Sequence, residues 1–298
     1  MCTECGCGLP LPTKIKGEPE EHHQHSHEHD CGHAHGHEHS HEHEHVDEQG
    51  NRYTHSHAHS SDHGHEHNHE QVGAAKSHDL IAVHKSILGA NNLKAERNRG
   101  YFRGVGLLAI NVLSSPGSGK TTLLKRIIET LAGEHKSGVI VGDLETDNDA
   151  RRLREAGGPV VQISTGTLCH LDADMVSRSL SEMSVRGLDF LFIENVGNLV
   201  CPSTFDLGED LRIAMLSVTE GEDKPLKYPP MFRFADIVIV SKVDLSEACE
   251  FNREMALENI RQVNPGAVVF EVSAKKGDGI EALCEYLVGA RRREYTPA

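Results

Sequence analysis

A glycine-rich segment, SSPGSGKTT (114–122), has the residue types needed to hold the phosphates of a nucleotide. Backbone N–H groups of such a loop can surround phosphate oxygens, and the N-terminus of a following helix adds a partial positive charge. Lys120 would reach the β and γ phosphates, and the Thr121 hydroxyl would bind Mg²⁺. Ser114 replaces the first glycine of the usual G-x-x-x-x-G-K-[ST] pattern, so an ordinary glycine-rich turn is the alternative. The candidate phosphate-binding residues are Gly117, Ser118, Gly119, Lys120, Thr121 and Thr122.

Two later motifs indicate which base would be bound. SKVD (241–244) and SAK (273–275) each follow an apolar run. In guanine-specific hydrolases a carboxylate at the position of Asp244 accepts hydrogen bonds from guanine N1–H and the N2 amino group, and adenine offers no such pair of donors. Ser241 stands where such loops usually have Asn or Thr, so the sequence does not show what stabilises this loop. The order of the motifs predicts GTP as the nucleotide. The candidate base-binding residues are Lys242, Asp244, Ser273, Ala274 and Lys275.

Acidic residues end two other apolar runs. Asp143 ends VIVGD (139–143), and Glu194 ends LDFLFIE (188–194). Carboxylates at the C-terminal ends of parallel strands face the ligand crevice. We therefore predict Thr121 and Asp143 as Mg²⁺ ligands, with Lys120, Asp143 and Glu194 as the catalytic residues. Capping of a neighbouring helix is the alternative role for either carboxylate.

The residue that positions the attacking water is not identified by the sequence. Asp147 and Asp149, in the segment LETDNDA (144–150), are weaker candidates. No glutamine stands at an obvious water-orienting position, and no arginine finger can be assigned. The pattern therefore predicts a GTPase with a slow intrinsic rate.

Three soft or borderline metal ligands lie near these motifs. Cys169 and His170 are adjacent, and Cys201 follows Glu194 and Gly197 in the segment ENVGNLVCP (194–202). Two thiolates and an imidazole suit tetrahedral Zn²⁺ or a more planar Ni²⁺ site. Since Cys201 lies in a segment that would sense the γ-phosphate, metal binding would be coupled to the nucleotide state. Two unrelated buried cysteines and a capping histidine are the alternative.

The first 17 residues form a cysteine-rich leader with Cys2, Cys5 and Cys7. A redox C-x-x-C pair needs a thioredoxin-like helix N-terminus. A zinc ribbon needs a second C-x-x-C pair. The sequence shows neither a thioredoxin-like unit nor a second pair. Three thiolates within six residues can surround one cation, and a free α-amine after removal of Met1 would complete a square-planar set suited to Ni²⁺. Chance clustering is the alternative.

Residues 18–76 are a low-complexity tract that holds nineteen of the 23 histidines, from His22 to His69. Almost no large apolar residues occur here, so the sequence predicts disorder. The imidazoles offer many weak, exchangeable metal sites. Only neutral imidazole binds metal, so capacity should fall as the pH drops through the unperturbed pKa near ~6.5.

Residues 77–298 have the pattern of an α/β domain. Leu80, Val83, Ile87 and Ala90 recur at helical spacing after Ser77 and predict an initial helix. Apolar runs then alternate with helix-like segments, which predicts a mostly parallel sheet covered on both faces, a three-layer P-loop fold. The predicted strands are residues 107–113, 139–143, 188–195, 235–242 and 267–273.

Bulk composition narrows the function. The net charge is −15, from 45 acidic and 30 basic residues, which argues against binding to nucleic acid or an anionic membrane. The apolar runs are too short to span a bilayer, and the N-terminus lacks an export segment. The eight cysteines then indicate metal ligands or buried thiols in a cytoplasmic protein. Cys249 and Cys284 are predicted to be packed side chains in helices.

Taken together, these motifs closely resemble the hydrogenase nickel-incorporation GTPases of the HypB family, which are related to the urease accessory GTPase. The resemblance covers essentially the whole chain and includes SSPGSGKTT, the Cys169–His170 pair, ENVGNLVCP and DKPLKYPPMFRFADIVIVSKVDL (223–245). It implies that Cys2, Cys5 and Cys7 form a high-affinity nickel site and that Cys169, His170 and Cys201 form a site in the GTPase domain. The long histidine tract, present in only some members, implies storage.

The resemblance also implies partners. It predicts a cytoplasmic chaperone that delivers Ni²⁺ to the NiFe-hydrogenase large subunit together with a small nickel metallochaperone of the HypA type. It further implies a GTP-linked homodimer with the second metal site at the subunit interface. Residues 78–99 are a hypothetical part of the partner-docking surface, with simple packing against the GTPase core as the alternative.

Two other functions compete with a GTP-driven nickel insertase. One is a nickel or zinc storage and buffering protein with a regulatory nucleotide site. The other is a signalling or translation-type GTPase with an incidental metal tail. The cysteine in the phosphate-sensing segment argues against this last function, because a signalling switch needs no soft ligand there.

Overall fold

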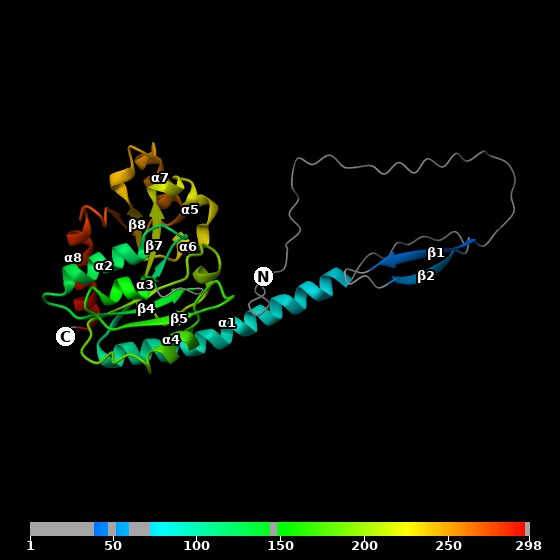
Figure 1. The fold of residues 1–298 in the computed structure, drawn as a ribbon, viewed down its shortest axis with the longest axis horizontal. Coiled ribbons are helices and arrows are strands. Elements are labelled where there is room, and N and C mark those ends of the chain that lie inside the picture. Colours follow the sequence, from blue (N-terminus) through cyan, green and yellow to red (C-terminus); the bar gives the residue numbers. More distant parts are fainter. Residues whose placement is uncertain (1–38, 47–51, 60–71, 144–147, 296–298) are drawn as a thin grey trace. The chain divides into compact units, whose positions relative to one another are not determined.

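The computed structural model describes residues 39–46, 52–59, 72–143 and 148–295, with side chains described from residue 85 onward. The chain divides into two compact units. One contains the described residues from 78 onward, and the other contains strands β1 (His39–Val46) and β2 (Arg52–His59) (Figure 1).

A seven-stranded sheet forms the centre of the larger unit. Its strand order is β5-β4-β6-β3-β7-β8-β9, and every neighbouring pair is parallel. The predicted α/β architecture with a parallel sheet is therefore confirmed. The strands are β3 (Leu108–Leu113), β4 (Ser137–Asp143), β5 (Val160–Ser164), β6 (Phe190–Glu194), β7 (Leu211–Ser217), β8 (Ile237–Ser241) and β9 (Val268–Val272).

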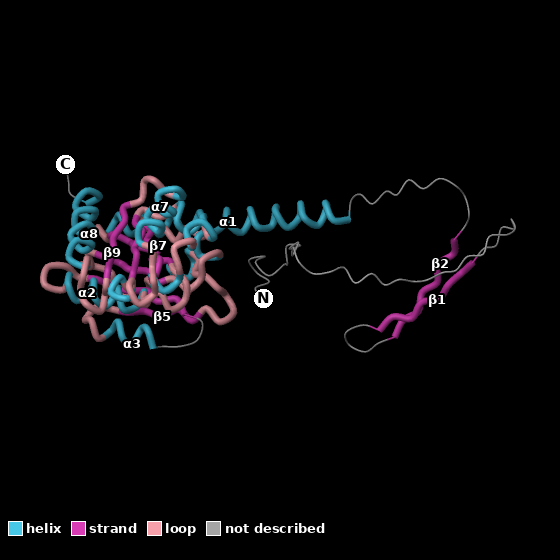
Figure 2. The backbone as a smooth tube through the Cα atoms, turned by 90° about the horizontal axis from the view of Figure 1, so that it is seen from above, coloured by secondary structure: helices cyan, strands magenta, loops and turns pink. Residues whose placement is uncertain are grey.

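Helices cover both faces of this sheet (Figures 1 and 2). One face packs against α2, α3 and α8, whose apolar side chains join one core cluster. The opposite face packs against α1 and α4 in a second cluster and against α6 and α7 in a third. The α-helices are α1 (Val72–Val105), α2 (Lys120–Leu131), α3 (Asn148–Arg154), α4 (Ala173–Ser179), α5 (Lys224–Lys227), α6 (Pro229–Arg233), α7 (Arg253–Val263) and α8 (Ile280–Tyr295). Short 3₁₀ helices are η1 (Cys201–Thr204), η2 (Val218–Glu220) and η3 (Val243–Leu245).

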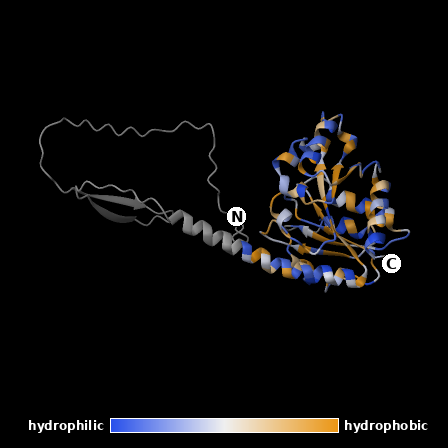
Figure 3. Cartoon of the chain, turned by 180° about the vertical axis from the view of Figure 1, so that it is seen from behind, coloured by the Kyte–Doolittle hydropathy of each residue, from blue (hydrophilic) through white to orange (hydrophobic). Residues whose placement is uncertain are grey.

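Strand β3 shows why the apolar runs become central strands. Leu108, Ile110 and Val112 point into the cluster under α2 and α8, whereas Ala109 belongs to the cluster under α1 and α4. A strand buried on both faces needs apolar residues at nearly every position, because successive side chains point to opposite faces. The strands accordingly form the apolar centre of the unit (Figure 3). The exception in β3 is Asn111, which is fully buried.

Two strands of the seven-stranded sheet were not predicted from the sequence. β5 lies at the edge of the sheet, where its first four residues are half-buried and Ser164 is exposed, so its sequence has only a short apolar run. β7, LRIAMLS, is central, between β3 and β8, yet it contains Arg212 and Met215, which also suit helices. Its strand conformation comes from pairing with two neighbours, which no local pattern records.

The predicted first helix is present but longer. Its C-terminal part buries Asn91, Ala95, Asn98 and Phe102 at spacings of four, three and four residues. Of the predicted apolar stripe, Ala90 is exposed and Ile87 is half-buried, whereas the side chains of Leu80 and Val83 lie outside the described part of the chain. The apolar spacing located the helix correctly, but two asparagines occupy its contact face.

Within the histidine tract, where the sequence predicts disorder, the structure describes an antiparallel hairpin of β1 and β2. The register pairs His39 with His59, His41 with His57 and His43 with His55. Alternation of histidine with other residues has the period of a strand, which accounts for this pairing. Residues 72–76, at the end of the tract, are also not disordered, because they form the first residues of α1. The other residues of the tract lie outside the described part of the chain.

Cys2, Cys5 and Cys7 also lie outside the described residues, so the leader site stays a prediction. Cys284 is buried in α8 as expected, whereas the prediction for Cys249 is wrong: it is exposed in a turn after η3. Across the described ranges, every helix is too short or too polar to cross a membrane.

Candidate nucleotide and metal sites

The glycine-rich segment forms the loop between β3 and the start of α2. Ser114 is fully buried, and its hydroxyl accepts a hydrogen bond from Lys120 Nζ at 2.8 Å and another from the hydroxyl of Ser118. Burial lowers the pKa of Lys120, while the nearby Glu194 carboxylate opposes this shift. The serine at the first glycine position therefore fits the loop, because it supplies a partner for a buried ammonium group.

Thr121 and Glu194 meet beneath this loop. Thr121 donates from its hydroxyl to Glu194 Oε1 at 2.7 Å. Glu194 is 3% exposed, and its other oxygen, Oε2, is buried without a hydrogen-bond partner. Burial raises the pKa of Glu194 to about 7, although the hydrogen bond from Thr121 and the charge of Lys120 act in the opposite direction. An unpartnered buried carboxylate oxygen beside a threonine hydroxyl fits a hard cation such as Mg²⁺, which prefers oxygen ligands.

Asp143 ends β4 on the same edge of the sheet. Its charge acts on Lys120, as does that of Asp149 at the start of α3, so both carboxylates lie near the phosphate-binding lysine. The segment 144–147, with the weaker candidate Asp147, lies outside the described residues.

The predicted base-binding motifs border a cavity of about 220 Å³ beside the glycine-rich loop. Ser273 donates to Asp244 Oδ1 at 2.6 Å, and this hydrogen bond lowers the pKa of Asp244, so the carboxylate stays an acceptor. Ser241 donates to the carbonyl of Ser118 at 2.9 Å, and Lys242 donates to that of Gly117 at 2.7 Å. Both motifs contribute to the lining, which consists of Ser118, Gly119, Thr122, Leu123, Ser241, Lys242, Asp244, Leu245, Val272, Ala274 and Lys275.

A larger groove, of about 720 Å³, lies between α2 and α8. None of the predicted site residues lines it. The smaller cavity is the better candidate for the base, because it joins the glycine-rich loop to Asp244.

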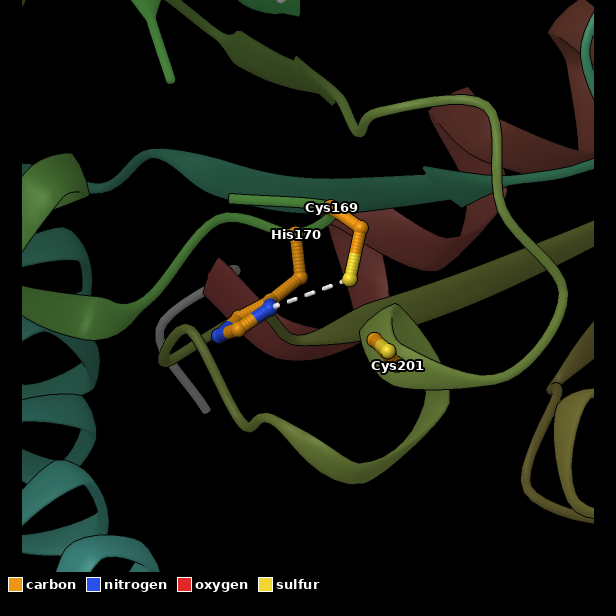
Figure 4. Close-up of side chains that lie close together, drawn as sticks. All are labelled: Cys169, His170 and Cys201. Carbon is orange, nitrogen blue, oxygen red and sulfur yellow. Dashed lines mark hydrogen bonds between the residues drawn. The ribbon is translucent and has the colours of Figure 1, made fainter. Parts of the chain in front are cut away.

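Cys169, His170 and Cys201 lie together (Figure 4). One potential ligand atom of each residue lies within 4.8 Å of the others, and they form the one cluster of this kind among the residues that the structure describes. Cys169 Sγ is 3.9 Å from His170 Nδ1. Cys169 and His170 come from the segment before α4, and Cys201 begins η1 after β6.

His170 is held by packing. Its ring stacks on Phe205, with centroids 3.9 Å apart and an interplanar angle of 25°. The side chain is almost fully buried, and this burial lowers its pKa while the charge of Asp172 opposes the shift. The imidazole therefore stays neutral to lower pH than in water, which is the form that binds a metal.

The two loops that carry these ligands are connected to the nucleotide site. Leu171 donates its backbone N–H to the side-chain oxygen of Asn195, the neighbour of Glu194. Gly197 packs directly on the glycine-rich loop, since a side-chain carbon there would lie 2.9 Å from the Cα of Pro116. The segment from Glu194 to Cys201 thus contacts the phosphate-binding loop near one end and carries a thiol at the other.

Two residues of this arrangement were not predicted from the sequence. Asn195 directly follows Glu194 at the end of a strand, which is a usable signal in the sequence. Phe205 gave no signal, because its contact with His170 depends on two loops folding together.

Comparison with known proteins identifies the family of this chain. The CobW/HypB/UreG nucleotide-binding domain model matches residues 108–271. Hydrogenase maturation factor HypB of Azotobacter chroococcum mcd 1 is 49% identical over 219 residues, which cover 72% of this chain and 71% of that protein.

Two crystal structures have the same fold. HypB from Archaeoglobus fulgidus has a TM-score of 0.65 at 42% identity and covers 68% of this chain and 100% of its own. HypB from Helicobacter pylori, solved in complex with nickel, has a TM-score of 0.66 at 41% identity. This match covers 70% of this chain and 99% of the Helicobacter pylori chain. The chain therefore belongs to the HypB family of hydrogenase maturation factors, within the CobW/HypB/UreG group of P-loop nucleotide-binding proteins.

Proposed function

We propose that this protein hydrolyses GTP and delivers Ni²⁺ to the NiFe-hydrogenase large subunit during hydrogenase maturation. The observation that carries the proposal is the cluster of Cys169, His170 and Cys201, within 4.8 Å, on loops that also contact the nucleotide site. Its family and the nickel in a relative's crystal structure support the metal and the pathway.

In the proposed nucleotide site, the loop from Gly117 to Thr122 surrounds the phosphates and Lys120 contacts the β and γ phosphates. Asp244 accepts from guanine, with Ser273 holding the carboxylate in place. Thr121, Glu194 and Asp143 are the residues that would hold Mg²⁺, which when bound neutralises phosphate charge. The described residues include no assigned water-orienting glutamine or arginine finger, so intrinsic hydrolysis should be slow.

In the proposed metal site, Cys169 and Cys201 supply thiolates and His170 supplies an imidazole to Ni²⁺ as cargo, with Zn²⁺ as a competitor of similar ligand preference. These three ligands leave room for a fourth, from water or a second subunit. Thiolates are needed, so the proposed place of action is the reducing cytoplasm. Cys2, Cys5 and Cys7 form the proposed high-affinity nickel site.

The proposal includes two protein partners, the NiFe-hydrogenase large subunit and a small nickel metallochaperone of the HypA type. It also includes a homodimer that forms with GTP. Val200, next to Cys201, is 60% exposed, which supports a contact surface beside the metal site. Sedimentation of the protein with GDP and with a non-hydrolysable GTP analogue tests the dimer.

The decisive experiment is a nickel titration of wild-type and Cys169→Ala protein, each with GDP and with a non-hydrolysable GTP analogue. We expect a nucleotide-dependent nickel affinity in the wild type that the variant lacks. Identical titrations for both proteins under both nucleotides would contradict a coupled metal site.

The role of hydrolysis needs its own test. Lys120→Ala should abolish GTP hydrolysis and hydrogenase maturation while the leader site still binds nickel. Full maturation of hydrogenase by this variant would exclude an insertase driven by hydrolysis.

A second function, nickel or zinc storage with a regulatory nucleotide site, is favoured by the nineteen histidines between His22 and His69. Deleting residues 18–76 separates the two. If delivery is the main task, hydrogenase activity should survive at ample nickel and fail under scarcity. If storage is the main task, most of the function should be lost at any nickel supply.

A further inference from the structure

The contact face of α1 contains two buried polar side chains. Asn91 is 7% exposed and Asn98 is 3% exposed, with Ala95 between them on the same face. Asparagine is a weak helix former, and burying an amide is costly unless its hydrogen bonds are made. A helix that only packed against the domain would be expected to bury apolar residues at these positions.

Each amide joins two loops that are far apart in the sequence. Asn98 Nδ2 donates to the carbonyl of Ala173 at 2.8 Å and to that of Leu207 at 3.0 Å. Asn91 Nδ2 donates to the carbonyl of Asp206 at 2.7 Å, and its Oδ1 accepts from the N–H of Ala173 at 2.9 Å. Two turns of one helix therefore hold residue 173 and residues 206–207 at a fixed spacing.

These are the loops that carry the metal ligands. Ala173 closely follows Cys169 and His170, and Asp206 closely follows η1, which begins at Cys201. Phe205, the stacking partner of His170, directly precedes Asp206. A change in the spacing of the two loops would therefore change the distances between the sulfur and nitrogen ligands.

Two further contacts hold α1 against the second loop. Arg99 donates from Nη2 to both carboxylate oxygens of Asp206, each at 2.9 Å. Gly208 has φ +89°, and a side-chain carbon there would lie 2.5 Å from the carbonyl oxygen of Ala95. The helix backbone thus approaches the loop as closely as glycine permits.

We propose that Asn91 and Asn98 are positioning residues for the metal site: by bridging the loop after His170 to the loop after Cys201, they set the separation of the three metal ligands. This inference rests on the metal site in the proposed function. Helix α1 would thus influence metal affinity, although the three candidate ligands all come from other segments.

The test is nickel binding by the full-length chain in which the leader cysteines Cys2, Cys5 and Cys7, and Cys31 of the histidine tract, are replaced by Ser. Sulfur-to-nickel charge-transfer absorbance then reports the remaining thiols, and the part that Cys169→Ala removes belongs to the proposed site. A chelator buffer fixes free Ni²⁺, so uptake by the histidine tract does not affect the reading. The variants are Asn91→Ala and Asn98→Ala in this background.

Asn264→Ala is the matched control. Asn264 Nδ2 also donates to two carbonyls, those of Phe232 and Ala235, both at 2.8 Å, in a different part of the domain. Thermal unfolding of all three variants shows whether the losses of stability are comparable. We expect Asn91→Ala and Asn98→Ala to weaken nickel binding about tenfold, which is the lower end of the effect of losing a residue that orients metal ligands. We expect Asn264→Ala to leave nickel binding unchanged.

The outcomes separate this inference from the function on which it rests. Wild-type affinity in both α1 variants, with the Cys169-dependent band intact, would overturn the positioning role and leave the metal site standing. Equal weakening of nickel binding in all three variants would also overturn the positioning role, because the effect would then come from a general loss of stability. Absence of any Cys169-dependent band in the parent protein would overturn the metal site itself, and the positioning role with it.

Discussion

The backbone N–H of Leu171 donates to the side-chain oxygen of Asn195 across 3.2 Å. Leu171 follows the candidate metal ligand His170, and Asn195 follows Glu194, which contacts Thr121 in the phosphate-binding loop. The same Asn195 oxygen accepts from the N–H of Val196 at 3.0 Å. One amide side chain, 1% exposed, thus connects the candidate metal loop to the strand end that would sense the nucleotide.

Replacing Asn195 by Ala should uncouple nickel binding from the nucleotide. In the wild type, nickel affinity with GDP and with a non-hydrolysable GTP analogue should differ within the range of about 5- to 150-fold that coupled sites show. The variant should lose most of this difference, because the Leu171 N–H then has no partner on the β6 side. Titrations with both nucleotides measure it.

Asn259→Ala is the control for that experiment, since Asn259 is similarly buried and donates to the carbonyl of Glu222 at 2.9 Å. It should retain the wild-type response. An unchanged nucleotide response in Asn195→Ala would show that coupling does not pass through this side chain.

Asp244→Asn should change the base preference from guanine to xanthine. The charged Asp244 accepts from two guanine donors, and an amide in its place presents a donor to one of them. Hydrogen bonds to charged groups contribute about 1.5–3 kcal/mol each, so GTP affinity should fall by about tenfold or more. Competition titrations with GTP, XTP and ATP measure this. Equal wild-type affinities for GTP and ATP would contradict guanine recognition altogether.

Local motifs predicted most of the residues that lie together at the candidate site, because each motif stands at the end of a strand. SSPGSGKTT, SKVD and SAK all follow apolar runs, and parallel strands bring their C-terminal ends to one edge. The doubt about Ser241 could not be resolved from sequence, because its support is a hydrogen bond to Ser118, which lies in a distant loop.

The contact face of α1 was not predictable for the same reason. Asn91 and Asn98 are polar residues in a helix, and sequence patterns place such residues on the solvent side. Their burial is explained only by the backbone groups of Ala173, Asp206 and Leu207, which lie far along the chain. Periodicity located the helix, but the burial of these two asparagines depends on long-range hydrogen bonds.

Glu194→Gln should make the metal-free, nucleotide-free protein more stable at high pH. Burial raises the pKa of Glu194 from 4.5 to about 7, so between these values the folded state binds more protons than the unfolded state. The free energy of unfolding must then fall as the pH rises through this window. Relative to wild type, the variant should be equally stable near pH 4.5 and gain up to about 3 kcal/mol by pH 8.

Urea unfolding at the two pH values measures this gain. An increase in stability that is the same at both pH values would contradict a buried, titrating Glu194. With Mg²⁺ and GDP bound the sign should reverse, since the carboxylate then has a cation beside it.

Gly197→Ala should weaken both sites at once. A side-chain carbon at residue 197 would lie 2.9 Å from Pro116 Cα and 3.0 Å from its N, and backbone atoms cannot move aside as a flexible side chain would. Overpacking of this kind typically costs about 1–3 kcal/mol. The cost falls on the contact between the phosphate-binding loop and the segment that ends at Cys201, so GTP affinity and nickel affinity should fall together. Gly133→Ala is the matched control, because a side-chain carbon there meets no atom within 4 Å. A Gly197→Ala protein that loses nickel affinity but binds GTP as the wild type does would show that the two loops do not move as one unit.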